Sequence, residues 1–374
     1  MDFDFSVEQK TLKEQGRRFL EQWGNPSSRR AVFEGEEPYN KKLWEKSAEL
    51  GWLGAAIPEQ FGGLGLGEVT LCAIAEELGR VLAPVPMASS VYLAAEALKL
   101  SGTAAQKQML LPSIASAEQI ATLALAERAG PIAASHMECR FADGVLNGTK
   151  IAVVDGLVAD VAVVAARAGE TVGLYVVSLG EAGVQRTPQK SIDPSRPVAR
   201  LDFADAPAQP LDGWQGDGNV LDALLARAAV FVAFEQLGGA EAALELAKGY
   251  ALERFAFGQP IGSFQAIKHK LAEVYVAIEL ARSQAYYAAW ALESAASELP
   301  VAAAAARLAA TAAFELAARE LIQVHGGIGM TWEHDCHLYY RRSRHLALIL
   351  GDSGQWREIL MAGLMADSQS GSLT

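Results

Sequence analysis

The spacing of hydrophobic residues divides the chain into helical, extended and again helical regions. In residues 3–23, apolar side chains recur among charged ones close to the i, i+3, i+4, i+7 spacing of an amphipathic helix. Further helical patterns end near Gly51 and cover residues 68–83, 89–100 and 103–116, where Pro112 interrupts the pattern. We therefore expect an N-terminal α-helical domain over residues 1–120.

The pattern changes near residue 121 to short runs typical of β-strands. ATLALAE, GVLNGTKIAVVDG, DVAVVAARA and VGLYVVSL are rich in strand-forming residues. The pair Asp143-Gly144 predicts a tight turn between two of these strands. PVARLDFADAP closes the region, and GWQGDGN has the composition of a linker. We expect a β-barrel or β-sandwich domain over residues 121–215.

Residues 216–374 return to long helical patterns. Four segments, near 220–253, 264–295, 300–326 and 336–365, are joined by short connections, which predicts an antiparallel four-helix bundle. The Ala-rich run over 301–318 contains Arg307 and Glu315, so it favours a packed helix over a membrane span. The polar residues 367–374 are expected to fray.

Composition narrows the possible partners and compartment. The 374 residues are 51% hydrophobic and carry a net charge of −12, so a surface for nucleic acid or anionic membrane is excluded, since both require a positive field. An anionic ligand must therefore meet locally placed arginine or lysine. Three widely separated cysteines, with no zinc-type CxxC pair, predict reduced thiols in a cytoplasmic protein. The first residues do not have the pattern of a signal peptide.

Two polar, glycine-containing segments interrupt the long helical patterns of the last region. They are RFAFGQPIGSFQ, residues 254–265, and QVHGGIGMTWEHD, residues 323–335. Each segment alone can be explained as a helix end followed by a turn. Their meaning therefore depends on the rest of the fold.

The order of the three domains, together with ERFAFGQPIGSFQAIKHKLAE and QVHGGIGMTWEHDCHLYYRR, strongly resembles the acyl-CoA dehydrogenase family over the whole chain. The resemblance implies an FAD cofactor between the β domain and the bundle of one subunit, with the adenine end completed by a neighbouring subunit. It further implies an acyl-CoA thioester substrate and electron-transfer flavoprotein as the electron acceptor. The chain is then expected in a homo-oligomer, or in a hetero-oligomer with a related subunit.

The resemblance assigns contacts with the FAD of the neighbouring subunit to six residues: Arg254, Phe257, Gln265, Gln323, Gly326 and Gly327. Arg254 matches the family arginine at the flavin pyrophosphate, where a planar guanidinium can bind two phosphate oxygens. Phe257 and Gln265 match residues around the adenine. At the second element, the glycine pair lets the backbone approach the dinucleotide closely.

The half-site that a subunit provides for its own flavin differs from the family pattern. A Thr-Glu-Pro element of the family is here Ala126, Glu127 and Arg128. In the strand GTKIAVV, Ala152 replaces an aromatic residue and Val154 replaces a hydroxyl residue. Two polar partners and one stacking ring for the flavin are therefore absent.

The general base of the family, a glutamate, is missing from both of its known positions. The usual position aligns with Leu350 and the following threonine with Asp352, whereas the position used by a minority of relatives aligns with Ala228. Glu235 lies two helical turns after Ala228 and is the best remaining candidate base. It also belongs to an EQLGG pattern that resembles a packing feature of the family. Asp352 is a weaker candidate.

Other titratable residues are expected to be structural. His325 and His269 favour hydrogen-bonded structural roles over acid–base roles, and the histidine spacing predicts no metal site. A basic cluster follows Glu333 and Asp335, and we expect it to form a local ion-pair network with them at a subunit contact. The cluster comprises Arg341, Arg342, Arg344 and His345.

Three interpretations of function remain open. In the first, the chain completes FAD on a partner subunit that supplies the catalytic glutamate, as in the heterotetrameric dehydrogenases of steroid side-chain CoA thioesters that it resembles. In the second, it is a self-sufficient homotetrameric acyl-CoA dehydrogenase with a base such as Glu235. In the third, it is a non-catalytic scaffold that binds CoA thioesters. Sequence leaves the acyl group undetermined.

Overall fold

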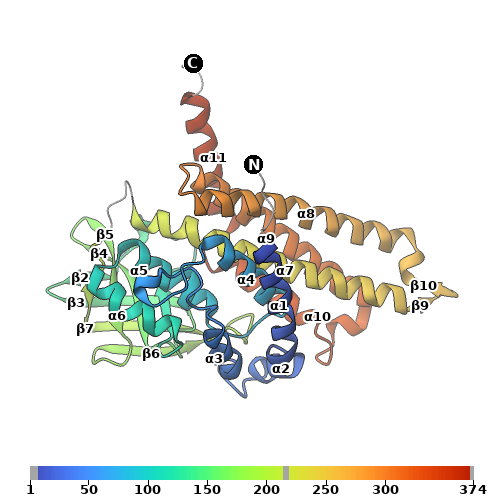
Figure 1. Cartoon of the computed structure of the whole chain (residues 1–374), viewed down its shortest axis with the longest axis horizontal. Helices are drawn as coiled ribbons and strands as arrows, with labels where there is room; N and C mark the ends of the chain where they lie inside the picture. The colour runs from blue at the N-terminus through green and yellow to red at the C-terminus, as the bar shows by residue number, and fades with distance from the viewer. Residues whose placement is uncertain (1–6, 214–218, 371–374) are drawn as a thin grey trace.

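The computed structural model describes residues 7–213 and 219–370. The chain forms a helical N-terminal region, a middle β-sheet and a bundle of long C-terminal helices, in the predicted order. Figure 1 shows the sheet at one end of the molecule and the long helices running from it to the other end, with the N-terminal helices alongside.

The N-terminal helices agree with the apolar spacing. They are α1 (Val7–Trp23), α2 (Pro26–Phe33), α3 (Lys41–Glu49), α4 (Glu68–Arg80), a π-helical segment η2 (Ala88–Ala95), α5 (Glu96–Ser101) and α6 (Ala104–Ala115). Residues 3–6 of the first predicted helix lie outside the described residues. The predicted interruption at Pro112 is wrong, because α6 continues through it. A capping box of Thr103 and Gln106 and the burial of Leu110 and Leu111 hold the helix in place.

The middle region is one eight-stranded sheet. Its strands are β1 (Ala121–Ala124), β2 (Arg140–Ala142), β3 (Val145–Val154), β4 (Val161–Ala168), β5 (Thr171–Ser178), β6 (Val184–Gln189), β7 (Val198–Pro207) and β8 (Gln209–Pro210). The order is β6-β7-β3-β2-β4-β5-β8, and β1 pairs with β4 in parallel. The predicted turn joins β2 to β3: Asp143 and Gly144 have φ values of 51° and 83°. Most of the predicted linker, residues 214–218, lies outside the described part.

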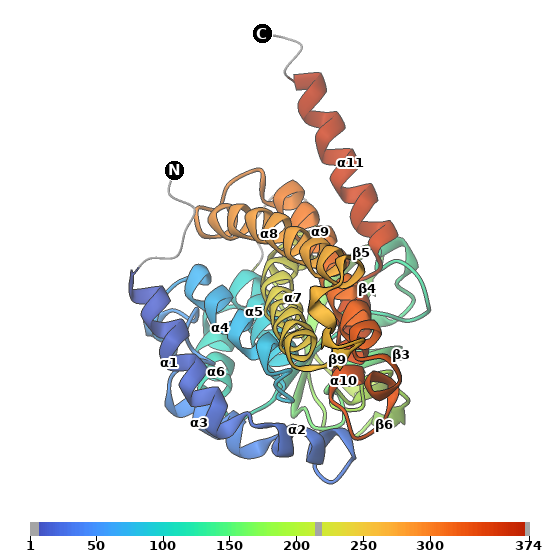
Figure 2. The same cartoon turned by 90° about the vertical axis from the view of Figure 1, so that its right-hand side faces the viewer.

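The C-terminal region contains α7 (Val220–Glu253), α8 (Gln265–Glu293), α9 (Leu299–His325), α10 (Cys336–Leu348) and α11 (Ser353–Ser370). The prediction of one helix over 336–365 is wrong. Gly351 has a φ of 86°, which turns the chain, and Asp352 Oδ1 then accepts a hydrogen bond from the Gln355 backbone N–H as a new helix begins. Figures 1 and 2 show α11 projecting away from the body. Residues 367–370 are helical rather than frayed, and 371–374 lie outside the described residues.

Two glycines allow α4 and α7 to pack in close contact. A Cβ atom on Gly79 would lie 1.9 Å from the Glu235 carbonyl oxygen, and one on Gly238 would lie 1.8 Å from the Glu76 carbonyl oxygen. The EQLGG segment is therefore a helix-packing element. Next to this contact, the buried Glu76 carboxylate accepts hydrogen bonds of 2.6 Å from both Lys13 and Arg282. These bonds tie α1 and α8 to α4.

Within the described residues, one apolar helical stretch has the length and composition to cross a membrane. It covers Leu299–Met330, and 61% of its most apolar window is buried. Packing of α9 against α7, α8, α10 and α11 accounts for this apolar composition. The three cysteines, Cys72, Cys139 and Cys336, are buried free thiols, as the sequence predicts.

Candidate active site

A cavity of about 450 Å³ lies where β1 and β3 meet the junction between α10 and α11. It brings together four positions at which the sequence departs from the family pattern: Ala126, Ala152, Val154 and Leu350. The wall of the cavity is largely apolar, and Leu350 is fully buried in it. The positions that the resemblance assigns to the flavin ring and the general base therefore line one cavity, and all four carry aliphatic side chains.

The β3 strand is also irregular at this cavity. Its pairing with β7 shifts register between Lys150 and Val153, and Ala152 has a φ of 51°, a conformation that favours glycine. The Ala152 N–H donates a 2.7 Å hydrogen bond to the Gln189 side chain. This backbone donor is therefore already paired within the protein.

Charged and titratable side chains occupy only part of the cavity wall. They are Arg128, Lys190, His345 and Asp352. Among the described lining residues, Asp352 is the one carboxylate, and it caps α11 through a 3.0 Å hydrogen bond from the Gln355 N–H. A carboxylate already occupied as a helix cap is a constrained base.

His345, which the sequence analysis placed in the basic cluster, lines the same cavity. It is 6% exposed, and its Nε2 atom has no hydrogen-bond partner among the described residues. Burial lowers the pKa of His345 to about 3; the positive charges of Arg196 and Arg342 add to this, and Asp193 opposes it. The imidazole is therefore neutral at physiological pH. Its neighbours in the sequence are arginines, so the sequence alone did not indicate a buried, neutral histidine at this cavity.

Glu235 does not line the cavity. It is 4% exposed, and its Oε1 atom lies 3.4 Å from Nη1 of Arg342. Arg342 also donates from Nε to Asp193 at 2.5 Å and from Nη2 to the Ser195 hydroxyl at 3.0 Å. Ala228, the second possible base position, is likewise buried and absent from the described lining. These contacts are those of a structural carboxylate.

Glu127 is held inside the β domain. Its carboxylate accepts hydrogen bonds from the backbone N–H groups of Glu138, at 2.6 Å, and Cys139, at 3.1 Å, and pairs with Lys150 at 2.6 Å. Burial lowers the pKa of Lys150, although Glu127 opposes the shift. Glu127 therefore fixes the loop that leads to the cavity.

The predicted local ion-pair network is wrong. Arg342 points into the interior, and Arg344 pairs with Glu315 of α9. Asp335 instead receives 2.6 Å contacts from Arg29 and Arg30 of α2. These charged residues pair with segments that are distant in sequence and pack over α10 and the turn before it, so the partners could not be read from neighbouring positions.

The six residues assigned to a neighbouring flavin are all exposed. Three of them belong to the segment after α7, in which Phe255–Ala256 (β9) and Gln259–Pro260 (β10) form a hairpin. Phe257, at its tip, is 97% exposed, and the Arg254 side chain has no hydrogen bond or ion pair with any described residue. The exposed Phe257 ring and the unpaired Arg254 guanidinium are available to a ligand or partner.

The hairpin and the cavity lie far apart in one chain. Figure 1 shows β9 and β10 at the end of the molecule opposite the sheet, and α7 connects the two ends. With 34 residues, α7 is roughly 50 Å long. Arg254 therefore cannot complete the cavity of its own chain.

The second glycine element lies at the same end of α7 as the hairpin, because His325, the residue before Gly326, stacks on Tyr250, one helical turn before Arg254, with ring centroids 4.1 Å apart. Gln323 lines a separate hollow of about 530 Å³ with Met330, Trp332 and Tyr340, and Ile192 belongs to both spaces. Gly326 and Gly327 are exposed in the 3-10 turn η5 (Gly326–Met330) that follows α9. The structure thus brings the two sequence elements together at the end of α7.

The comparisons with known proteins agree with this architecture. Residues 6–118 match the family model described as acyl-CoA dehydrogenase, N-terminal domain, and residues 216–365 match that of the C-terminal domain. The chain is 35% identical to the acyl-CoA dehydrogenase IpdE2 of Mycobacterium tuberculosis, over 92% of this chain and 93% of that one. The chain belongs to the acyl-CoA dehydrogenase family.

Solved structures of this family superpose closely on the chain. The steroid acyl-CoA dehydrogenase Tcur3481-Tcur3483, as its G363A variant, has 30% identity and a TM-score of 0.89, covering 97% of this chain and 99% of that one. The ChsE4-ChsE5 complex from Mycobacterium tuberculosis has 29% identity and a TM-score of 0.87, covering 96% and 98%. The family comprises flavin oxidoreductases, and its cofactor is FAD.

The residues of this acyl-CoA dehydrogenase fit FAD unevenly. The exposed guanidinium of Arg254 and the open backbone at Gly326 and Gly327, where an added Cβ would meet no atom within 4 Å, suit a dinucleotide phosphate and adenosine. At the cavity, by contrast, Ala126 and Val154 offer no hydroxyl group to the ring. The hairpin and the glycine turn thus suit a dinucleotide, whereas the cavity lacks the hydroxyl groups that the family resemblance implies.

Proposed function

We propose that this chain is the non-catalytic subunit of a heteromeric acyl-CoA dehydrogenase. It completes the adenine and pyrophosphate end of an FAD held chiefly by a related partner subunit, which also supplies the base. The observation that carries this proposal is the separation between an exposed, unpaired Arg254 hairpin and a largely apolar cavity in which Leu350 stands at the position of the family glutamate.

The reaction is α,β-dehydrogenation of an acyl-CoA thioester. FAD, when bound, accepts the β-hydrogen of the acyl group as hydride, while a carboxylate removes the α-proton. In this chain Arg254 would hold the pyrophosphate through its guanidinium, and Phe257 and Gln265 would border the adenine. Gln323, Gly326 and Gly327 would reach the same cofactor end through a side-chain amide and the backbone.

The similar proteins support a heteromeric assembly. Two of the solved relatives carry paired names, Tcur3481-Tcur3483 and ChsE4-ChsE5, and the second is described as a complex. The first is a steroid acyl-CoA dehydrogenase, so a steroid-derived acyl-CoA is the substrate class that we favour. Electron-transfer flavoprotein is the proposed acceptor. Buried free thiols support a reducing compartment such as the cytoplasm.

A self-sufficient homotetramer is the second candidate, and one observation favours it. Asp352 lines the cavity two residues after Leu350, and a rearranged α11 would free its carboxylate. Glu235 is less suited because Arg342 already binds it. A scaffold that binds CoA thioesters without flavin is the third candidate, in keeping with the aliphatic cavity.

Co-expression with a related acyl-CoA dehydrogenase subunit separates these functions. We expect turnover of a steroid-derived acyl-CoA by the co-purified pair and none by this chain alone. Turnover by the chain alone that disappears in Asp352→Asn would establish the homomeric enzyme. A chain that binds CoA thioesters but gains neither flavin nor activity with any related subunit would establish the scaffold.

A further inference from the structure

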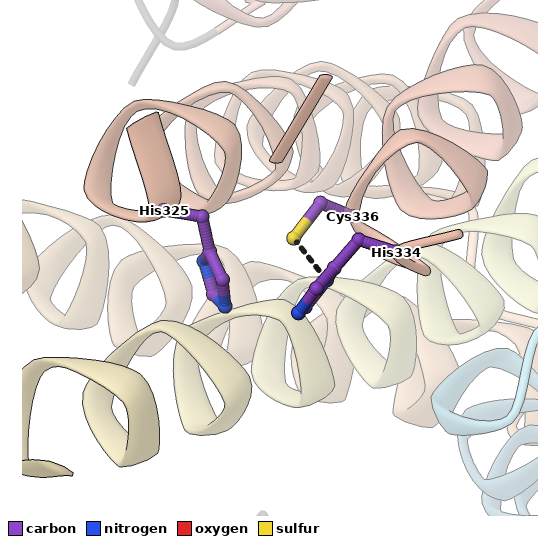
Figure 3. A group of neighbouring side chains, drawn as sticks. All are labelled: His325, His334 and Cys336. Atoms are coloured by element: carbon purple, nitrogen blue, oxygen red, sulfur yellow. Dashed lines mark hydrogen bonds between the residues drawn. The ribbon is translucent and has the colours of Figure 1, made fainter. Parts of the chain in front are cut away.

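Three potential metal ligands meet where α9 ends and α10 begins. His325 is the last residue of α9, Cys336 is the first residue of α10, and His334 lies in the turn before it. Their ligand atoms all lie within 4.8 Å of one another. Figure 3 shows the two imidazole rings and the thiol facing a common space. The chain therefore returns on itself over residues 326–335 to bring the three groups together.

The His325 ring is oriented for coordination. Its Nδ1 atom lies 2.8 Å from the Leu321 carbonyl oxygen, so Nδ1 carries the proton and donates it, leaving the Nε2 lone pair free. The ring also stacks on Tyr250, with centroids 4.1 Å apart and an interplanar angle of 22°. A backbone carbonyl that fixes the far nitrogen of a histidine is the usual support for a metal ligand.

The spacing of the other two groups is close to that of zinc ligands. Cys336 Sγ lies 3.2 Å from His334 Nδ1. Zinc bonds of about 2.3 Å to sulfur and about 2.0 Å to nitrogen, at a tetrahedral angle, place such atoms roughly 3.5 Å apart. The three ligand atoms lie within 4.8 Å of one another, so the widest pair must close by up to about 1.3 Å to reach this spacing. His334 is half-buried in its turn, whereas His325 and Cys336 are buried at helix ends.

We propose that His325, His334 and Cys336 form a structural zinc site that links the end of α9 to the start of α10. The two imidazoles and one thiolate are a donor set that selects zinc over calcium or magnesium. On binding, the Cys336 S–H bond breaks, its proton leaves to solvent and an S–Zn bond forms, with no change of oxidation state. A water molecule completes the fourth position.

The surroundings allow an ion to enter and remain. A hollow of about 610 Å³ is lined by His334 and Cys336. Asp335, beside them, is already bound by Arg29 and Arg30, so those cations are compensated rather than directed at the zinc. The site needs only this chain. Its test is therefore independent of the proposed role with a partner flavin.

Cobalt and zinc titrations of the isolated full-length chain test the site. After chelator treatment under reducing, anaerobic conditions, we expect Co²⁺ to produce the d–d bands of a tetrahedral ion and a thiolate charge-transfer band. Stoichiometric Zn²⁺ should remove both signals. Cys336→Ala should abolish the charge-transfer band and lower zinc affinity by on the order of tenfold or more. Cys72→Ala is the matched control, because this thiol is equally buried in α4, away from the cluster.

A second variant protects the test against misfolding. His334→Ala changes a half-buried turn residue, so the fold should persist, as circular dichroism can check, while the tetrahedral bands are lost. A chain without cobalt bands would overturn the proposal. So would zinc binding that is equally strong in wild type, Cys336→Ala and His334→Ala, because that result identifies adventitious metal elsewhere.

Discussion

Arg342 binds Glu235 in the interior, with Nη1 of the arginine 3.4 Å from Oε1 of the glutamate. The same guanidinium holds Asp193 at 2.5 Å, and both carboxylates are nearly inaccessible to solvent. Glu235 thus joins α7 to α10 and lies outside the aliphatic cavity. A residue that the sequence nominates as a base is, in the fold, a partner of a buried arginine.

Glu235→Gln should therefore affect stability rather than chemistry. We expect the free energy of unfolding to fall by about 1–2 kcal/mol, because Arg342 retains its ion pair with Asp193 and loses only the longer charged contact with Glu235. Asp193→Asn, the matched change at the shorter contact, should cost about 3–5 kcal/mol. Urea unfolding measures both. Loss of turnover in the heteromer with unchanged stability of Glu235→Gln would instead make Glu235 a base.

Acid should destabilise the chain partly through His345. Its pKa falls from 6.5 in the unfolded chain to about 3 in the fold. Between these values the unfolded state binds the extra proton, so stability is highest above pH 6.5 and declines as pH falls, by roughly 1.4 kcal/mol per unit for one proton. His345→Leu should remove this part of the slope.

Urea unfolding between pH 6.5 and 4.5 isolates the histidine contribution. Asp193 and Glu96 also have lowered pKa values, because burial is outweighed by nearby cations, and they lose their contribution at lower pH. His325 and His337, whose pKa values burial lowers, leave a residual slope. His269→Leu, at an exposed position on α8, is the control. An unaltered slope in His345→Leu would contradict the assignment.

Leu350→Glu should not create a dehydrogenase. The new carboxylate would be fully buried among aliphatic side chains, so we expect its pKa to rise and the free energy of unfolding to fall by about 2–4 kcal/mol at neutral pH. Ala126 and Val154 would still offer no hydroxyl to a flavin. Acyl-CoA turnover by the purified variant is the measurement, with Leu350→Gln as the isosteric control. If Leu350→Glu turns over acyl-CoA and Leu350→Gln does not, the cavity lacks only a carboxylate and the prediction is wrong.

Arg254→Ala should weaken flavin retention without weakening the fold. The side chain has no described partner to lose, so the unfolding midpoint of the free chain should be unchanged. In the heteromer, loss of a charge-assisted phosphate contact should raise the flavin dissociation constant by about tenfold to a hundredfold. Arg140→Ala, at an exposed arginine of β2, is the control. Equal flavin release from both variants would remove Arg254 from the site.

Local patterns in the sequence predict the elements, whereas tertiary contacts decide the site. Helical spacing locates α7, α8 and α9, and the pair Asp143-Gly144 locates the turn between β2 and β3. Both predictions hold because the residues that specify each feature are neighbours in sequence. The break at Gly351 was missed because apolar spacing continues across it. Asp193 and Arg342 are 149 positions apart, so periodicity could not pair them.

The proposed zinc ligands show the same difference between local sequence patterns and tertiary contacts. His325 and Cys336 are only eleven positions apart, yet their approach depends on how the turn between α9 and α10 folds. Regular histidine spacing does not indicate such a cluster, since two of the proposed ligands flank an irregular segment. A histidine at a helix end followed by a short glycine-rich turn and a His-x-Cys pair is the pattern that could have found them.

The flavin content per chain tests the proposed subunit role most directly. It is measured by absorbance of released FAD after purification of this chain alone and of its complex with a related subunit. We expect colourless protein when the chain is alone, and in the complex one FAD for each pair of unlike chains. One tightly bound FAD per chain in the protein purified alone would contradict the proposal.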